Sequence, residues 1–161
     1  MPGENLSWIE AQERAGIIAV ESYEVELDLT RGDLFFGSKT TVRFTATAGS
    51  STFIDAITHR VDRIELNGHS LPIAEVNDGV RITLPNLAAQ NELIVEGEFI
   101  YTNTGEGLHR FVDPVDDEVY LYTQFEVPDS RRMFAVFEQP DLKATFQFTV
   151  TAPTYWQVTS N

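Results

Sequence analysis

The sequence contains no cysteine, which excludes disulfide bridges, thiolate metal sites and a cysteine nucleophile. It is also poor in basic residues, because 11 lysines and arginines stand against 25 aspartates and glutamates, a formal net charge of -14. Charge does not hold so acidic a chain on nucleic-acid phosphates or on an anionic membrane, so we expect neither partner. No run approaches the roughly 18 apolar residues of a membrane-spanning helix.

The N-terminal residues, MPGENLSWIEAQER, lack the cationic region and the apolar run of a secretory signal. Together with the absence of cysteine, this favours a cytoplasmic location. The 161 residues, 42% of them hydrophobic, are enough for one domain around a single core. We therefore expect one domain over residues 1–161.

Most of the chain alternates hydrophobic and polar residues with a period of two, which is typical of strands with one buried face. Such runs lie at 23–29, 42–46, 63–66, 80–84, 93–101, 119–125, 144–150 and 155–159. Turn pairs such as Asn67-Gly68 separate them. Ser7 and Glu10 have the spacing of a capping box, and Trp8, Ala11, Ala15 and Ile18 then repeat with helical spacing. The sequence predicts an all-β, antiparallel β-sandwich or saddle with a short leading helix.

Two long segments interrupt this pattern. Residues 103–118 are predicted to form a polar loop of a length that is usually functional or mobile. Residues 127–141 are predicted to form a packed crossover with at most one turn of helix. The final TYWQVTSN is interpreted as a strand at its exit turn, so we expect the chain to be a fragment of a longer protein.

Side chains for catalysis or metal binding are sparse. Three histidines, His59, His69 and His109, lack the H-E-x-x-H spacing of a zinc-binding helix. We expect the first two to be solvated beside turns, whereas His109 has either a hydrogen-bonding or a catalytic role. The acidic residues within 113–118 form either a solvated turn or a hard-cation site, although their spacing does not match a calcium loop. No serine or threonine has a local base, so no catalytic residue is predicted.

One strand carries a candidate binding face. Alternation places Tyr120, Tyr122, Gln124 and Glu126 on the same side. A carboxylate and a carboxamide two residues apart suit a small ammonium group, because the first supplies charge and the second a further acceptor oxygen. From these residues alone, a solvated strand face and an ammonium-binding face are both open.

Four sequence elements follow one another with separations that are specific for a known family. They are T-Q-F-E at 123–126, R-R at 131–132, F-E-Q-P-D at 137–141 and K-A-T-F at 143–146, preceded by NTGEGLHRF. With them the chain resembles the N-terminal domain of the zinc-dependent aminopeptidase N family, most closely its actinobacterial members. In that family the domain is a β-rich saddle or sandwich that runs slightly beyond the end of this chain. The pair Glu138-Gln139 departs from the commoner acidic pair.

The resemblance implies a parent enzyme that releases N-terminal amino acids from peptides with a free N-terminus. The family's zinc site, an H-E-x-x-H motif with a G-A-M-E-N type motif, belongs to a following catalytic domain that would be the partner of this one. Neither motif is present here, so the resemblance implies no metal ligand in this chain. It implies that Gln124 and Glu126 bind the substrate's α-ammonium group. The alternative is a free-standing β-sandwich binding or interaction module.

Overall fold

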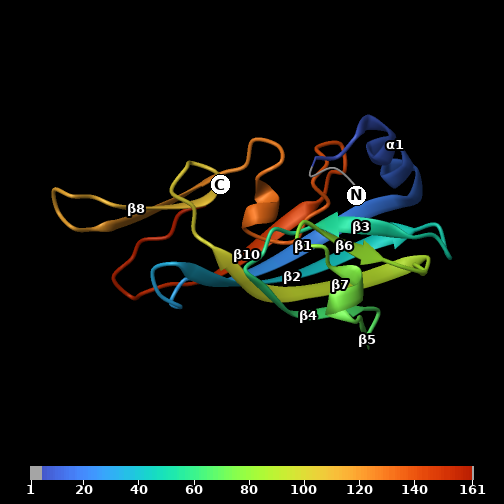
Figure 1. Ribbon diagram of the computed structural model, residues 1–161, viewed down its shortest axis with the longest axis horizontal. Coiled ribbons are helices and arrows are strands. Elements are labelled where there is room, and N and C mark those ends of the chain that lie inside the picture. Colours follow the sequence, from blue (N-terminus) through green and yellow to red (C-terminus); the bar gives the residue numbers. More distant parts are fainter. Residues whose placement is uncertain (1–4, 161) are drawn as a thin grey trace.

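The computed structural model describes residues 5–160, which fold around a six-stranded sheet (Figure 1). The elements are, in chain order, α1 (Trp8–Ile17), β1 (Ile18–Asp28), β2 (Phe35–Ala46), β3 (Thr52–Asp55), β4 (Arg60–Leu66), β5 (His69–Ser70), α2 (Ile73–Val76), β6 (Arg81–Leu84), β7 (Gln90–Ile100), β8 (Gly107–Val112), β9 (Val119–Gln124), the 3-10 turn η1 (Ser130–Arg132) and β10 (Thr145–Thr151). Within this range, no helix has the length and apolar character needed to cross a membrane.

The large sheet has the strand order β10-β1-β2-β7-β4-β5, and all its neighbours are antiparallel except β1 and β10, which are parallel. Two antiparallel ribbons, β3–β6 and β8–β9, complete the fold. In Figure 1, α1 and the β8–β9 ribbon lie toward opposite ends of the molecule. The predicted β-rich fold with a short leading helix is confirmed.

The core contains one face of the large sheet together with the β3–β6 ribbon. Val42 and Leu93 of the sheet and Ile54 and Ile82 of the ribbon are completely buried and belong to one hydrophobic cluster. The burial of β1 and β7 alternates along each strand, as the period-two pattern predicts. The other face of the sheet is polar and carries exposed ion pairs such as Lys39–Glu26, with 2.5 Å between Nζ and Oε1.

One loop prediction and one strand prediction are wrong, and the short strands β3 and β5 were missed. Residues 103–118 are not a continuous loop, because β8 lies within them and pairs with β9 over its whole length. The residues of β8 do not alternate in polarity, so the sequence pattern does not predict a strand there. The segment forms a strand because it pairs with β9. Residues 155–159 form no strand, since no segment within residues 5–160 pairs with them. The predicted crossover at 127–141 is confirmed, with η1 as its single helical turn.

A buried arginine holds the helix α1, and of its apolar residues Ile17 packs against the core while Trp8 does not. Trp8 is 73% exposed, whereas Arg14 is 1% exposed. The Arg14 guanidinium donates to the Asp55 carboxylate at 2.8 Å and to Gln139 Oε1 at 3.0 Å. The Gln139 amide in turn donates to the Ala11 carbonyl at 2.9 Å. One charge therefore joins the helix, β3 and the crossover.

Gln139 is the residue at which the chain departs from the commoner acidic pair, and its hydrogen bonds explain why an amide fits this position. An amide both accepts from Arg14 and donates to Ala11, which a carboxylate cannot do. Its neighbour Glu138 is buried, and burial raises its pKa above the usual range. Hydrogen bonds from Ser130 Oγ and from the Arg131 backbone amide act in the opposite direction.

The N-terminal end of α1 is fixed by the predicted capping box. Ser7 Oγ accepts from the Glu10 amide, and the Glu10 carboxylate accepts from the Ser7 amide at 2.8 Å. The same carboxylate accepts from the Arg81 guanidinium at 2.6 Å. These hydrogen bonds, that from Arg81 above all, lower the pKa of Glu10 from 4.5 to about 2.

Replacing Arg14 with methionine is expected to lower the free energy of unfolding by about 3–5 kcal/mol, because the buried Asp55 carboxylate loses its nearer charge partner and keeps only Arg81, whose Nε lies 3.9 Å from Oδ1. Lys39→Met, which breaks an exposed pair, is the matched control and is expected to cost about 0–1 kcal/mol. Urea unfolding of the two variants measures both values. Equal losses would contradict the structural role of Arg14.

Glu10 is expected to make stability depend on pH. Because its pKa is lowered in the folded protein, its contribution is present above about pH 4.5 and is lost as the pH falls toward 2. Glu10 is partly exposed, so we expect Glu10→Gln to cost only about 1 kcal/mol at pH 7. Urea unfolding at pH 7 and near pH 3 should show the difference between variant and parent shrinking. A difference that grows in acid would contradict this assignment.

Candidate functional site

The two predicted substrate-binding residues lie at the base of the β8–β9 ribbon. Gln124 is the last residue of β9, directly opposite Gly107 of β8, and is half-buried. Glu126 lies two residues beyond, outside the strand and exposed. The predicted continuous row therefore ends at Gln124, and Glu126 belongs to the turn that leads to η1.

Gln124 and Glu126 are in direct contact through the backbone. Gln124 Oε1 accepts a hydrogen bond from the Glu126 amide. A carbonyl oxygen has two lone pairs, so this bond leaves one acceptor position for a ligand. The Glu126 carboxylate has neither a hydrogen-bond partner nor an ion-pair partner among residues 5–160. The pair thus offers an amide oxygen that contacts the Glu126 backbone and, on Glu126 itself, a negatively charged side chain.

Arg132 links the two segments that flank this pair. Its Nε donates to Asp129 Oδ1 at 2.9 Å, and its Nη2 lies 3.6 Å from Glu106 Oε2, in the loop before β8. The carboxylates of Glu106 and Asp129 thus share one guanidinium. Two carboxylates against one guanidinium, with Glu126 in the turn whose carbonyl accepts from the Asp129 amide, leave the charge balance at the ribbon base negative, which favours a cation.

Gly107 allows η1 to lie close to the ribbon opposite Gln124. Its φ of 61° is in the left-handed region. A Cβ at this position would lie 2.7 Å from the Arg132 Cβ and 3.5 Å from the Asp129 carbonyl oxygen. Only glycine fits both the backbone angle and this close approach. The position of Arg132, and with it the charge balance, depends on this contact.

His109 lies on the same ribbon face and has structural contacts. Its Nδ1 accepts from the Gly105 amide at 2.9 Å, and its ring stacks on Tyr122 with 4.7 Å between centroids. The hydrogen-bonding alternative for His109 is therefore supported. His59 is exposed and stacks on Phe35, and His69 is exposed, as expected for histidines beside turns.

The acidic residues of 113–118 form the turn between β8 and β9. Asp113 Oδ1 accepts from the Val115 amide at 2.8 Å, and Asp116 Oδ1 accepts from the Glu118 amide at 2.9 Å. These are local turn hydrogen bonds, which support the solvated-turn alternative. In the part of the chain that the structure describes, no three histidine, aspartate or glutamate side chains come together as metal ligands.

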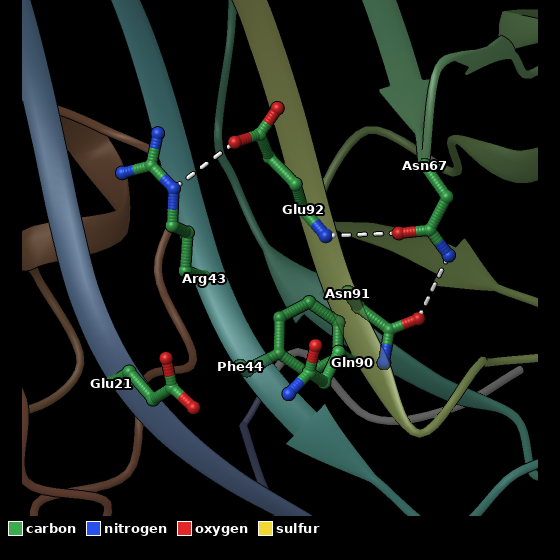
Figure 2. A pocket seen from close by; sticks show the side chains of 7 residues that line it. All are labelled: Glu21, Arg43, Phe44, Asn67, Gln90, Asn91 and Glu92. Atoms are coloured by element: carbon green, nitrogen blue, oxygen red, sulfur yellow. Dashed lines mark hydrogen bonds and ion pairs between the residues drawn. The ribbon is translucent and has the colours of Figure 1, made fainter.

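Hollows also lie elsewhere on the surface. Figure 2 shows one on the large sheet, lined by Glu21, Arg43, Phe44, Asn67, Gln90, Asn91 and Glu92. Arg43 donates to Glu92 at 3.0 Å, and Asn67 exchanges hydrogen bonds with the Asn91 side chain and the Glu92 amide (Figure 2). Since these polar groups satisfy one another, we assign them a structural role.

The second hollow is an apolar groove of about 580 Å³ beside the β8–β9 ribbon. Its walls come from β1, β9, β10 and the last described residues, and they include Leu27, Leu121, Tyr122, Phe148, Val150 and Trp156. Along β10 all residues but Val150 are exposed. Phe146 is 48% exposed and Phe148 37%, so an aromatic edge lies next to the groove.

The sequence pointed to Gln124 and Glu126 but missed the residues that surround them. Glu106 and Gly107 lie within the family element NTGEGLHRF and Arg132 within R-R, but neither element indicates which residues contact each other. Asp129 lies in no such element, and only the folded crossover brings it together with Arg132 and Glu106.

Comparisons with known proteins agree on one family. Residues 19–161 match the Peptidase M1 N-terminal domain family. Over 165 aligned residues the chain is 58% identical to aminopeptidase N of Streptomyces lividans, an alignment that covers all of this chain and 19% of that protein. A stretch of 33 residues is 61% identical to aminopeptidase N of Acetobacter pasteurianus, covering 20% of this chain and 9% of that one.

The fold resembles that of leukotriene A4 hydrolase from Saccharomyces cerevisiae, with a TM-score of 0.70 and 15% sequence identity. That match covers 92% of this chain and 28% of the hydrolase chain. This chain therefore spans about a fifth of the length of the Streptomyces protein and about a quarter of the yeast one.

Gly107→Ala is expected to destabilise the protein more than Gly105→Ala. Both glycines have positive φ, so both variants carry the strain of a left-handed alanine. Only at position 107 does the new Cβ meet backbone-linked atoms, whereas at 105 it meets the Tyr122 hydroxyl at 3.6 Å. Urea unfolding should show an extra loss of about 1–3 kcal/mol for Gly107→Ala. Equal losses would contradict the close approach of η1.

Proposed function

The chain belongs to the peptidase M1 N-terminal domain family, and from that premise we propose that it anchors substrate for a zinc-dependent aminopeptidase. The family membership confirms the resemblance seen in the sequence. The full-length protein would release N-terminal amino acids from peptides. The Streptomyces relative is about five times as long as this chain, and the proposal assigns the catalytic domain to the remaining length.

The proposal assigns zinc to that catalytic domain, because the described residues of this chain offer no ligand set for it. When bound there, zinc supplies a Lewis acid and an activated water for hydrolysis of the peptide bond. The contribution of this chain is different. Its residues would hold the peptide's first residue at a fixed distance from the reacting bond, which is an effect of position and charge.

The observation that carries the proposal is the exposed Glu126 carboxylate, without a partner among residues 5–160, on the residue whose backbone amide donates to Gln124 Oε1. An α-amino group has a pKa of about 7.7–8.0 and is therefore largely cationic at neutral pH. An internal peptide nitrogen carries no charge. A fixed carboxylate at this position thus favours chain termini over internal bonds, which is the specificity of an aminopeptidase.

The negative balance at the ribbon base adds to this preference. Arg132 is engaged by Asp129 and Glu106, so it does not neutralise Glu126. A cationic peptide terminus supplies the missing counter-charge. Peptide termini that are acetylated lack the charge and would gain nothing from Glu126.

The proposed partner of this domain is the catalytic domain of the same polypeptide. The aromatic edge of β10, with Phe146 and Phe148 exposed, is a suitable surface for that contact. Exposed aromatic side chains next to one another mark interaction surfaces in soluble proteins. Covering them would also protect the unpaired edge of β10.

In the full-length protein, Glu126→Gln is expected to lower kcat/KM for leucyl anilide at least tenfold, which corresponds to about 1.4 kcal/mol. The amide keeps the shape of the side chain and removes its charge. Glu118→Gln is the matched control, because it makes the same change in the turn just before β9, at the other end of that strand from Gln124. Steady-state kinetics measure both. A Glu126→Gln enzyme as active as the control would contradict the ammonium-binding role.

A further inference from the structure

The register of the β8–β9 ribbon arranges aromatic side chains in a row that starts at Gln124. Gly107 pairs with Gln124, His109 with Tyr122 and Phe111 with Tyr120. Side chains of directly paired residues share one face, and so do residues two apart along a strand. Tyr122 therefore follows Gln124 on the same face at about 7 Å, and Tyr120 follows at about 14 Å.

Tyr122 is held in place while half of its surface stays accessible. Its ring stacks on His109 with 4.7 Å between centroids and 26° between planes. The His109 ring is itself fixed by the hydrogen bond from the Gly105 amide to Nδ1. Tyr122 is nevertheless 50% exposed, and it borders the apolar groove of about 580 Å³. A fixed, accessible aromatic ring is a surface for apolar contact.

We infer that Tyr122 is a specificity-determining residue that contacts the side chain of the peptide's first residue and favours large apolar side chains. The inference rests on the proposed function, because it takes the α-ammonium group to lie at Gln124 and Glu126. From there the side chain of leucine or phenylalanine extends far enough to reach a ring about 7 Å along the strand. The methyl group of alanine does not.

The same geometry excludes Tyr120 from this role. It lies about 7 Å beyond Tyr122, outside the reach of a single side chain anchored at Gln124. Yet Tyr120 has the same exposure, 50%, lies on the same face and also borders the groove. The two tyrosines thus form a matched pair that differs in distance from the anchor. His109 acts through Tyr122 as a positioning residue.

The test compares kcat/KM of the full-length protein for leucyl, phenylalanyl and alanyl anilides. Tyr122→Ser is expected to lower the leucyl-to-alanyl and phenylalanyl-to-alanyl ratios about five- to tenfold, which is in the range of a few apolar groups in a pocket. Tyr122→Gln, which keeps a long side chain without a ring, should lower them likewise. Tyr122→Phe should keep both ratios, and so should Tyr120→Ser.

Ratios that are unchanged in both Tyr122→Ser and Tyr122→Gln would overturn the inference, as would an equal fall in Tyr120→Ser. Glu126→Gln, measured with the same three substrates, separates this failure from failure of the proposed function. Loss of the ammonium contact lowers kcat/KM for all three by a similar factor and leaves the ratios unchanged. If Glu126→Gln shows that loss while the Tyr122 variants keep their ratios, only the specificity assignment is wrong.

Discussion

Two carboxylates share the Arg132 guanidinium, and this sharing determines the charge at the base of the β8–β9 ribbon. Arg132 binds Asp129 and lies within ion-pair distance of Glu106, which leaves Glu126 as a negative charge without a partner among residues 5–160. Gly107 makes this arrangement possible, because η1 lies so close to the ribbon that a Cβ at position 107 would clash with the Arg132 Cβ. A close backbone contact and a charge balance are thus coupled, and the binding site that we propose depends on both.

Charges at the other end of the molecule are used differently. Arg14 and Asp55 are buried together and connect α1 to β3 and to the crossover that contains η1. The crossover therefore has a fixed inner end at Gln139 and a fixed outer end at Arg132. The buried pair Arg14–Asp55 and the partly buried pair Arg132–Asp129 thus lie at the two ends of one crossover. For a ligand, the relevant result is that Glu126 is exposed, whereas Gln124, two residues earlier, is half-buried.

Sequence patterns predicted the elements in which side-chain polarity follows the backbone period. The strands β1 and β7 alternate cleanly, and Ser7 with Glu10 marks the helix start. The remaining elements depend on tertiary contacts that the sequence pattern does not show. β8 is a strand because β9 pairs with it. The helix α1 packs through Arg14, while Trp8 faces solvent. Likewise, strand alternation indicated Gln124 and Glu126, but no local pattern joins Glu106 to Arg132 across the fold.

The central claim is that Glu126 and Gln124 hold the positively charged terminus of a peptide. A crystal structure of the full-length protein with a bound peptide analogue that has a free amino group tests it most directly. The account predicts that the amino nitrogen lies about 3 Å from a Glu126 carboxylate oxygen and from Gln124 Oε1. An amino group bound to other carboxylates, with Glu126 facing solvent, would contradict it.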